Sequence, residues 1–177
     1  MNTQSLYQKA IKFAGKKHKD QLVPGTESNY LMHLSNVAME ILIASHHTTN
    51  FDTDFSVQVA ILHDTIEDTN ATFKELEENF GKSVTEAVYA LTKNKGLPKE
   101  QHMQDSLNRI KKLQHEVWAV KLADRITNLQ PPPSHWVPEK KQKYLDQAKL
   151  ILKELNDGND YLAKRLETKI IEYNDYL

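Results

Sequence analysis

Residues 60–69 read AILHDTIEDT, an apolar run that leads directly into a His-Asp pair and then a Glu-Asp pair. On a continuous helix, residues four apart share a face, so His63 would lie beside Glu67 and Asp64 beside Asp68. Imidazole and carboxylate groups among Ala, Ile and Leu are costly in a core unless a partner or a metal ion compensates them. The stretch therefore predicts a divalent cation held by His63 and Asp64, with Glu67 and Asp68 handling a proton or a water. The alternative is a helix end capped by His63 and Asp64, with Glu67 and Asp68 solvated.

The composition limits the classes of protein to consider. The chain has 177 residues, enough for one sizeable core, so we expect a single domain over residues 1–177. Lys and Arg total 23 against 24 Asp and Glu, so there is no basic excess and no nucleic-acid partner is expected. The absence of cysteine excludes disulfides and thiolate ligands. No signal peptide or membrane-spanning stretch is evident, which predicts a soluble, cytoplasmic protein without a membrane partner.

Low glycine and proline content with abundant Leu, Ala, Lys, Glu and Gln predicts an all-α domain, a bundle of about eight to ten helices. Apolar periodicity and breakers place helices at about 5–18, 31–45, 54–66, 72–80, 83–91, 99–113, 117–129, 138–155 and 160–177. Capping boxes at 72–75 and 83–86 are expected to open the two short helices, and Gly81 to end the first of them. No strand is expected.

Two more residues are candidates for the same site. His33 opens the second helix, where neither the helix dipole nor an apolar face favours a histidine, so it is either a surface or capping residue or a ligand. Asp124 follows the apolar run at 117–123 and is expected to be drawn into the interior, where a cation or several donors must compensate it. Pairing with Arg125 is the alternative, although adjacent helical residues point apart. Two imidazoles and two carboxylates suit Mn²⁺, Fe²⁺, Zn²⁺ or Mg²⁺ and leave positions open for water and a phosphate oxygen.

With these residues assembled, the chain resembles the HD-domain metal-dependent phosphohydrolases. Within them it is similar to the RelA/SpoT-type guanosine tetraphosphate pyrophosphohydrolases, especially the stand-alone small alarmone hydrolases. The resemblance covers nearly the whole chain. Its matching segments, in order, are FA at 13–14 with His18 and Gln21, YLMHL at 30–34 with VA at 37–38, LHDTIEDT at 62–69, FG at 80–81, LTK at 91–93, and VKLADR at 120–125 with NL at 128–129.

The resemblance implies a reaction and a metal site. The reaction is hydrolysis of the 3′-pyrophosphate of (p)ppGpp to GDP or GTP and pyrophosphate. One divalent ion, usually Mn²⁺, would be bound by His33, His63, Asp64 and Asp124.

The resemblance also implies roles around the metal. Glu67 and Asp68 match the pair that positions or activates the attacking water, and Asn128 matches a residue of the substrate pocket. Lys121 and Arg125 are further candidates for binding the nucleotide.

Two departures concern the substrate. The family carries an Arg-Lys pair in the loop before the first histidine, whereas residues 22–29 here read LVPGTESN and hold no basic residue. The family commonly has an Arg two residues after Asn128, where this chain has Gln130 and three prolines. Lys93 and Lys95 are candidates to compensate, unless their loop is simply solvated. The alternatives are therefore another nucleotide or a phosphorylated dinucleotide such as NADPH, and, in a different class, a non-catalytic nucleotide sensor.

Overall fold

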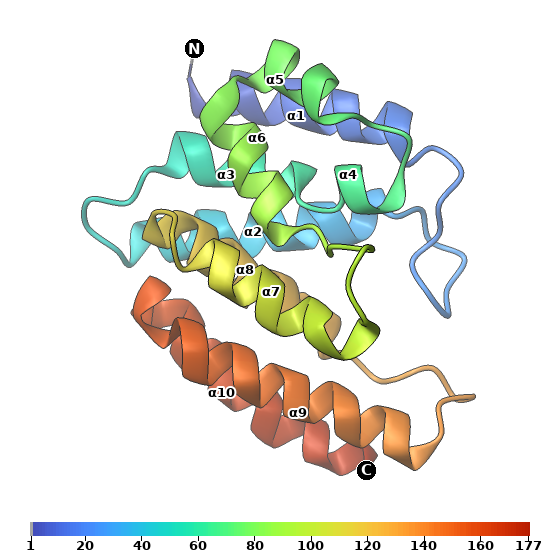
Figure 1. Ribbon diagram of the computed structural model, residues 1–177. Helices are drawn as coiled ribbons and strands as arrows, with labels where there is room; N and C mark the ends of the chain where they lie inside the picture. Colours follow the sequence, from blue (N-terminus) through green and yellow to red (C-terminus); the bar gives the residue numbers. More distant parts are fainter. Residues whose placement is uncertain (1) are drawn as a thin grey trace.

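The computed structural model describes residues 2–177, which form ten α-helices and three short 3-10 helices (Figure 1). The α-helices are α1 Thr3–Lys17, α2 Leu31–His46, α3 Thr53–Leu62, α4 Thr65–Asp68, α5 Phe73–Phe80, α6 Lys82–Leu91, α7 His102–Ile110, α8 His115–Asn128, α9 Pro138–Leu155 and α10 Asp160–Tyr173. The 3-10 helices are η1 Lys99–Gln101, η2 Asn156–Gly158 and η3 Asn174–Tyr176. Within the described range, the β-structure amounts to one isolated bridge between Leu22 and Asn29, so the all-α prediction is confirmed.

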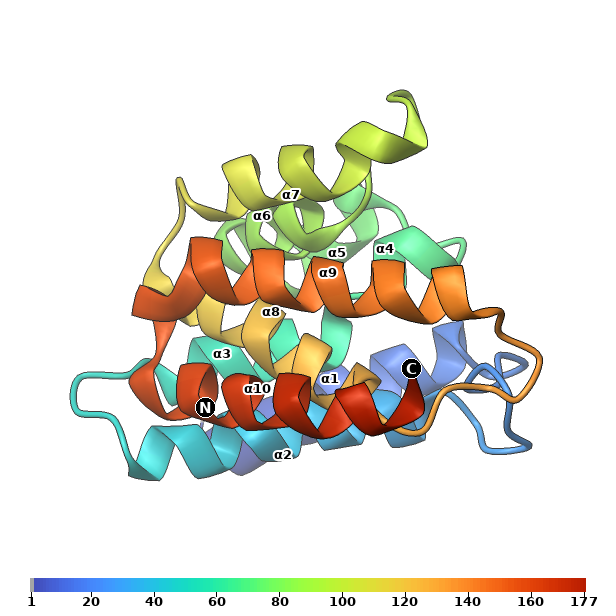
Figure 2. The same ribbon diagram turned by 90° about the horizontal axis from the view of Figure 1, so that it is seen from below.

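Helix α8 lies at the centre of the bundle. It contacts α2 and α3 as well as α9 and α10, and Figures 1 and 2 show α9 and α10 packed together against it. Eight of its fourteen residues are buried, as expected for a helix surrounded by others rather than lying on a surface. A polar residue on α8 is therefore held in the interior, and this applies to Asp124 and Arg125. None of the helices in residues 2–177 has the length and apolar character needed to span a membrane.

The helix expected over residues 54–66 is interrupted at His63 and Asp64, which corrects that prediction. α3 ends just before this pair and α4 begins just after it. The His63 ring donates from Nδ1 to the backbone oxygen of Ala60, 2.7 Å away, and so occupies the carbonyl that the Asp64 N–H would use in a continuous helix. Neighbouring residues on a regular helix point about 100° apart. The interruption instead lets both side chains face one point.

Capping explains the boundaries of α5 and α6. The hydroxyl of Thr72 accepts from the backbone N–H of Glu75, so the first predicted cap is confirmed. Gly81 adopts a φ of 82°, a conformation in which glycine is favoured, and it both ends α5 and precedes α6. The second predicted capping box is wrong, because α6 begins at Lys82, before Ser83, and has no side-chain cap. The two helices meet too closely to leave a separate capping residue.

A buried ion pair joins α2 to α10. The Glu40 carboxylate is 2% exposed and accepts from Nε and Nη2 of Arg165 at distances of 2.6 to 2.9 Å. A buried carboxylate needs such a partner. The pair therefore helps to fix the C-terminal helix against the layer that carries His33.

Candidate metal centre and active site

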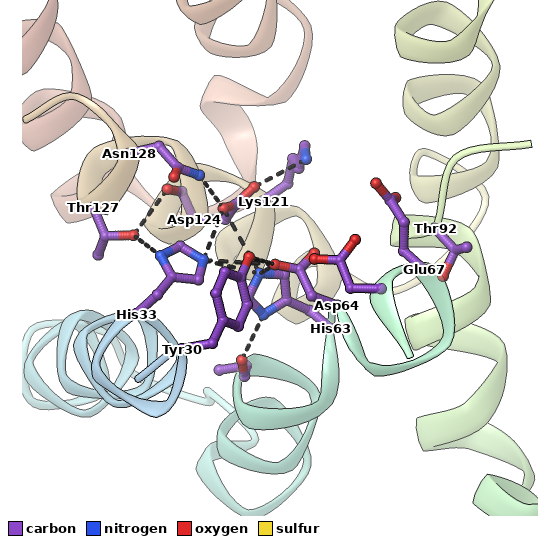
Figure 3. A network of polar contacts seen from close by, with 12 residues as sticks. Tyr30, His33, His63, Asp64, Glu67, Thr92, Lys121, Asp124, Thr127 and Asn128 are labelled. Carbon is purple, nitrogen blue, oxygen red and sulfur yellow. Dashed lines mark hydrogen bonds and ion pairs between the residues drawn. The ribbon is translucent and has the colours of Figure 1, made fainter. Parts of the chain in front are cut away.

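Four side chains from α2, the α3–α4 junction and α8 meet at one side of a cavity of about 740 Å³ (Figure 3). They are the predicted ligands His33, His63, Asp64 and Asp124. His33 is 6% exposed and makes no cap, so it is neither a surface nor a capping residue. Asp124 is also 6% exposed, as expected for a carboxylate drawn into the interior. A second cavity, of about 680 Å³ between α1, α2 and the start of α3, has no lysine or carboxylate in its lining.

Both histidine rings are oriented by hydrogen bonds from their outer nitrogens. His63 Nδ1 faces the carbonyl of Ala60, which can only accept, so Nδ1 carries the proton. His33 Nδ1 lies 3.4 Å from the hydroxyl oxygen of Thr127, whose own proton is donated to the backbone oxygen of Asp124. In the neutral form of each ring, Nε2 is therefore the nitrogen that carries the lone pair, and the two Nε2 atoms lie 3.4 Å apart (Figure 3). This is the tautomer that a metal-binding histidine requires.

The carboxylates complete a set of donors around the same point. Asp64 Oδ2 lies 3.0 Å from His63 Nε2 and 3.7 Å from His33 Nε2. Asp124 Oδ1 lies 3.5 Å and 3.7 Å from the Nε2 atoms of His33 and His63. Donor atoms that bind one ion at about 2.1 Å are themselves separated by about 3.0 to 3.5 Å. The spacing of nitrogen and oxygen donors thus fits a single divalent cation, and His33, His63 and Asp64 offer ligand atoms that all lie within 4.8 Å of one another.

Neighbouring donors hold both carboxylates ionised. Burial alone would raise the pKa of Asp124, but Lys121 and the two histidines outweigh it and keep that pKa well below its usual range. Burial opposes ionisation of Asp64 too, and His63 nevertheless lowers its pKa. Burial would lower the pKa of His63, whereas Asp64 and Asp124 raise it well above the ordinary value. The two ionised carboxylates therefore give this cluster an electrostatic preference for a positive charge, whether a proton on His63 or a metal ion.

Two of the three predicted substrate-binding residues contact Asp124. Lys121 Nζ lies 3.0 Å from Asp124 Oδ2, and Asn128 Nδ2 donates to Asp124 Oδ1 at 2.5 Å. The alternative pairing of Asp124 with Arg125 is absent among the described contacts. Lys121 and Asn128 still line the cavity, as do Asp64 and Asp124, so a molecule bound beside the candidate metal centre can reach them.

Glu67 and Asp68 both line the cavity, but their surroundings differ. Both carboxylate oxygens of Glu67 are occupied by Lys93, Oε2 by its backbone N–H at 2.8 Å and Oε1 by Nζ at 2.5 Å. Lys95 adds a contact to the backbone oxygen of Glu67. Asp68 is exposed and accepts a single side-chain hydrogen bond, from Gln21 at 3.0 Å. Although the residue as a whole is exposed, partial loss of solvent around its carboxyl group and then the charge of Asp64 raise the pKa of Asp68. The two residues of the pair are thus not equivalent.

Arg125 is the third predicted substrate-binding residue, and no carboxylate in residues 2–177 forms an ion pair with it. It is 5% exposed, and its Nε and Nη1 atoms are buried without a hydrogen-bond partner among the described residues. Its guanidinium lies over the ring of Tyr144, 4.5 Å from the centroid. Both residues line the cavity, together with Lys99 and Lys143. The side of the cavity towards α9 is therefore cationic and aromatic.

Sequence reasoning missed three residues of the site. Tyr30 donates to Asp64 Oδ2 at 2.5 Å, Thr127 orients His33, and Tyr144 supports Arg125. Tyr30 lies in a segment that carries the family resemblance, which was a usable signal. Thr127 lies three residues after Asp124 on α8, and Tyr144 lies on the amphipathic helix α9. The local sequence pattern distinguishes neither position.

The fold and the site define an HD-domain protein, and comparison with known proteins agrees. The family model for the HD domain matches residues 10–156, so the chain belongs to the HD domain family. Among curated proteins, the guanosine-3′,5′-bis(diphosphate) 3′-pyrophosphohydrolase MESH1 of Danio rerio is 33% identical over 167 residues, which cover 92% of this chain and 91% of that protein. MESH1 of Xenopus tropicalis is 34% identical over 168 residues, covering 92% of each.

A solved structure of a metazoan orthologue of SpoT that hydrolyses ppGpp superposes with a TM-score of 0.82 at 28% identity, covering 98% of this chain and 97% of the other. The chain is therefore a homologue of the MESH1-type small ppGpp 3′-pyrophosphohydrolases, and the predicted family is confirmed.

Proposed function

We propose that this protein is a metal-dependent nucleotide phosphohydrolase that removes the 3′-pyrophosphate of (p)ppGpp. The observation that carries the proposal is the meeting of two histidine Nε2 atoms and two aspartate oxygens beside the acidic pair of α4. Similarity to ppGpp hydrolases over nine-tenths of the chain supports the substrate.

In this proposal His33, His63, Asp64 and Asp124 hold one divalent ion, with Mn²⁺ the first choice and Fe²⁺, Zn²⁺ or Mg²⁺ as alternatives. The absence of sulfur and the presence of two carboxylates favour a catalytic rather than a structural ion. When bound, such an ion supplies Lewis-acid chemistry, since it lowers the pKa of a coordinated water and polarises a phosphoryl oxygen. Thr127, Tyr30, Lys121 and Asn128 orient the ligand side chains.

The reaction requires a proton acceptor as well as a bound phosphate. Water adds to the phosphorus attached to O3′, the bond between that phosphorus and O3′ breaks, and pyrophosphate leaves while O3′ takes up a proton. Asp68 is the group best suited to accept the proton of the attacking water, because its carboxylate lines the cavity and is only partly engaged. Glu67, with both oxygens held by Lys93, instead positions the loop at one edge of the cavity.

The uncompensated charge of Arg125 supports an anionic substrate. A buried guanidinium without a carboxylate partner is costly in free energy. A ligand that supplies the negative charge removes this cost, and its binding free energy becomes more favourable. Lys99 and Lys143 add cations to the lining of the same cavity. These groups offer the basic contacts that residues 22–29 lack. Because they lie on η1, α8 and α9 rather than in that loop, a different nucleotide, including a phosphorylated dinucleotide such as NADPH, stays the second candidate.

The test is release of phosphate and pyrophosphate from ppGpp, pppGpp, NADPH and common nucleotides by the Mn²⁺-loaded protein, with Asp64→Ala as the blank. Pyrophosphate from ppGpp that disappears in the blank is the expected result. Turnover of another nucleotide alone would retain the mechanism and change the substrate. Undiminished hydrolysis by Asp64→Ala would contradict the proposed centre, and nucleotide binding without any turnover would favour a sensor.

A further inference from the structure

A line of hydrogen bonds runs from a buried histidine at the end of α1 to the free member of the acidic pair. His18 Nδ1 lies 2.6 Å from Gln21 Oε1, and Gln21 Nε2 lies 3.0 Å from Asp68 Oδ2. Among residues 2–177, no side chain of these three is hydrogen-bonded to a side chain of the four candidate metal ligands; the backbone N–H of Asp68 donates to the backbone oxygen of Asp64 at 2.9 Å.

The direction of each bond follows from the acceptor at the end of the line. An ionised carboxylate can only accept, so the Gln21 amide must turn its NH₂ group to Asp68 and its carbonyl oxygen to His18. That oxygen also only accepts, and His18 must therefore carry its proton on Nδ1. Burial lowers the pKa of His18, which agrees with a neutral ring. One arrangement of protons satisfies the whole line.

His18 is held too rigidly to be an accidental partner. The residue is 1% exposed, and its ring stacks on that of Tyr30 with centroids 5.2 Å apart and planes 19° from parallel. Its backbone N–H caps α1 through Ala14, and its backbone oxygen accepts from Gln21 N–H at 3.0 Å. The ring nevertheless leaves Nε2 buried without a partner among the described residues. A buried imidazole nitrogen without a hydrogen-bond partner costs free energy, so packing alone does not explain why a histidine occupies this position.

Asp68 is the residue that needs such support. It is the last residue of the one-turn helix α4, it is exposed, and Gln21 is the one side chain in residues 2–177 that hydrogen-bonds its carboxylate. Glu67 beside it is already fixed through Lys93. Without Gln21, the Asp68 side chain would be free to leave the rotamer that faces the cavity.

We infer that His18 and Gln21 are positioning residues that hold Asp68 in place as the proton acceptor of the reaction. The inference rests on the proposed function for the role of Asp68, but the hydrogen-bonded line itself does not. His18 sets the orientation of the Gln21 amide, and the amide sets the direction in which the Asp68 carboxylate presents its free oxygen. Misplacement of a catalytic group by about 1 Å costs about 100-fold in rate.

The activity test uses Gln21→Ala. We expect kcat to fall by about 10- to 100-fold, with KM changed by less than about 2-fold and bound metal unchanged. In an Asp68→Asn background, the same substitution should cause no further loss, whereas a merely structural role would lower the activity of both backgrounds equally. Gln142→Ala is the matched control, because Gln142 makes the same amide-to-carboxylate bond to Asp146 on the outer face of α9. An equal loss in the Asp68→Asn background would overturn the inference.

The His18 variants separate hydrogen bonding from packing. His18→Phe keeps a ring against Tyr30 but has no donor, so kcat should fall as in Gln21→Ala. His18→Asn places an amide N–H close to the position of Nδ1 and should recover most of the activity. Equal kcat for His18→Phe and the unsubstituted protein would overturn the role of His18.

A third measurement is independent of turnover. Nitrogen-15 NMR of the metal-free protein near neutral pH should show His18 as the neutral tautomer protonated at Nδ1, and crystal structures should show Asp68 ordered in the unsubstituted protein and disordered in Gln21→Ala. A His18 protonated at Nε2, or an equally ordered Asp68 in both proteins, would overturn the inference. Failure to hydrolyse any nucleotide together with the expected tautomer and order would instead contradict the proposed function alone.

Discussion

The Nε2 atoms of His33 and His63 lie 3.4 Å apart, while the Nδ1 atom of each ring is directed away, to Thr127 in one case and to the Ala60 carbonyl in the other. The two rings come from residues thirty positions apart, on α2 and at the end of α3. Each ring is thus oriented with Nε2 towards the candidate metal position before any ion binds. The outer contacts are as much a part of the candidate metal centre as the ligands, and they can be tested separately.

Thr127→Val should weaken metal binding without unfolding the protein. The substitution preserves the shape of the side chain and removes the acceptor of the His33 Nδ1 proton, so we expect the metal dissociation constant to rise by about 10- to 100-fold. Isothermal titration with Mn²⁺ measures it. Thr168→Val is the control, since the Thr168 hydroxyl makes a comparable bond to a backbone oxygen of its own helix on the exposed side of α10. Equal affinities for both variants would contradict the role of Thr127.

Arg125→Met should separate stability from function. Because the guanidinium is buried without a carboxylate partner, replacing it by an apolar group of similar size should leave the free energy of unfolding within about 1 kcal/mol or raise it. We expect kcat/KM for an anionic nucleotide to fall by about 10- to 100-fold, because the charge-assisted contact between the guanidinium and the substrate is lost. Denaturant unfolding and steady-state kinetics measure the two effects.

Arg165→Met is the contrasting control for that prediction. It leaves the Glu40 carboxylate buried without its partner, and should lower the free energy of unfolding by about 1 to 3 kcal/mol. The lower part of that range is expected, because the Arg165 side chain is 41% exposed and solvent screens part of its charge. A larger loss of stability from Arg125→Met than from Arg165→Met would contradict the view that Arg125 lacks a counter-charge.

Stabilisation by Mn²⁺ should increase with pH. In the metal-free protein the pKa of His63 is raised, so its contribution to stability is present in full below the unfolded value of about 6.5 and is lost as pH rises towards the folded pKa. The pKa values of Asp64 and Asp124 are lowered, so their contributions are lost only at acid pH, as pH falls from about 3.9 through their folded values. A bound cation replaces the positive charge that the metal-free cluster loses at high pH.

We therefore expect the rise in melting temperature on adding Mn²⁺ to be larger at about pH 8 than at about pH 5.5, where protons compete with the ion. Differential scanning calorimetry of chelator-treated protein, with and without Mn²⁺, provides the measurement. Asp64→Ala should show little shift at either pH. A shift that is greatest at the lower pH would contradict binding of the ion by deprotonated ligands.

Glu67→Gln should loosen the loop after α6. The Glu67 carboxylate accepts from the backbone N–H of Lys93, and a neutral amide can retain at most one of the two contacts that Lys93 makes. Hydrogen exchange at the Lys93 amide should become faster, while bound metal is unchanged. We expect a smaller loss of kcat than in Asp68→Asn, for which loss of a proton acceptor predicts about 100-fold or more. Equal losses in the two variants would show that Glu67 also takes part in proton transfer.

Much of the fold follows from local patterns along the chain. Apolar periodicity placed the long helices, and the Thr72 cap and Gly81 marked the ends of α5 correctly. The predicted start of α6 failed because the sequence offers two plausible N-caps two residues apart, Gly81 and Ser83, and only the packing of α5 against α6 selects between them. The interruption at His63 was missed for a similar reason, since it depends on a hydrogen bond from the His63 side chain to the backbone oxygen of Ala60, which replaces a helical backbone bond.

The amino-acid sequence alone specified the helical class and pointed to four residues of ligand type, and the apolar run before Asp124 indicated the burial of that carboxylate, because burial is encoded in the local spacing of apolar residues. The partners of the charged groups depended on the tertiary structure. In the structure Lys121 contacts Asp124 and Lys93 contacts both carboxylate oxygens of Glu67, whereas Arg125 has no carboxylate partner among the described residues. The pairing of charged side chains depends on how helices distant in the chain pack, because a hydrogen bond requires its two heavy atoms to lie about 3 Å apart. That distance is set by the assembled fold and by no local pattern.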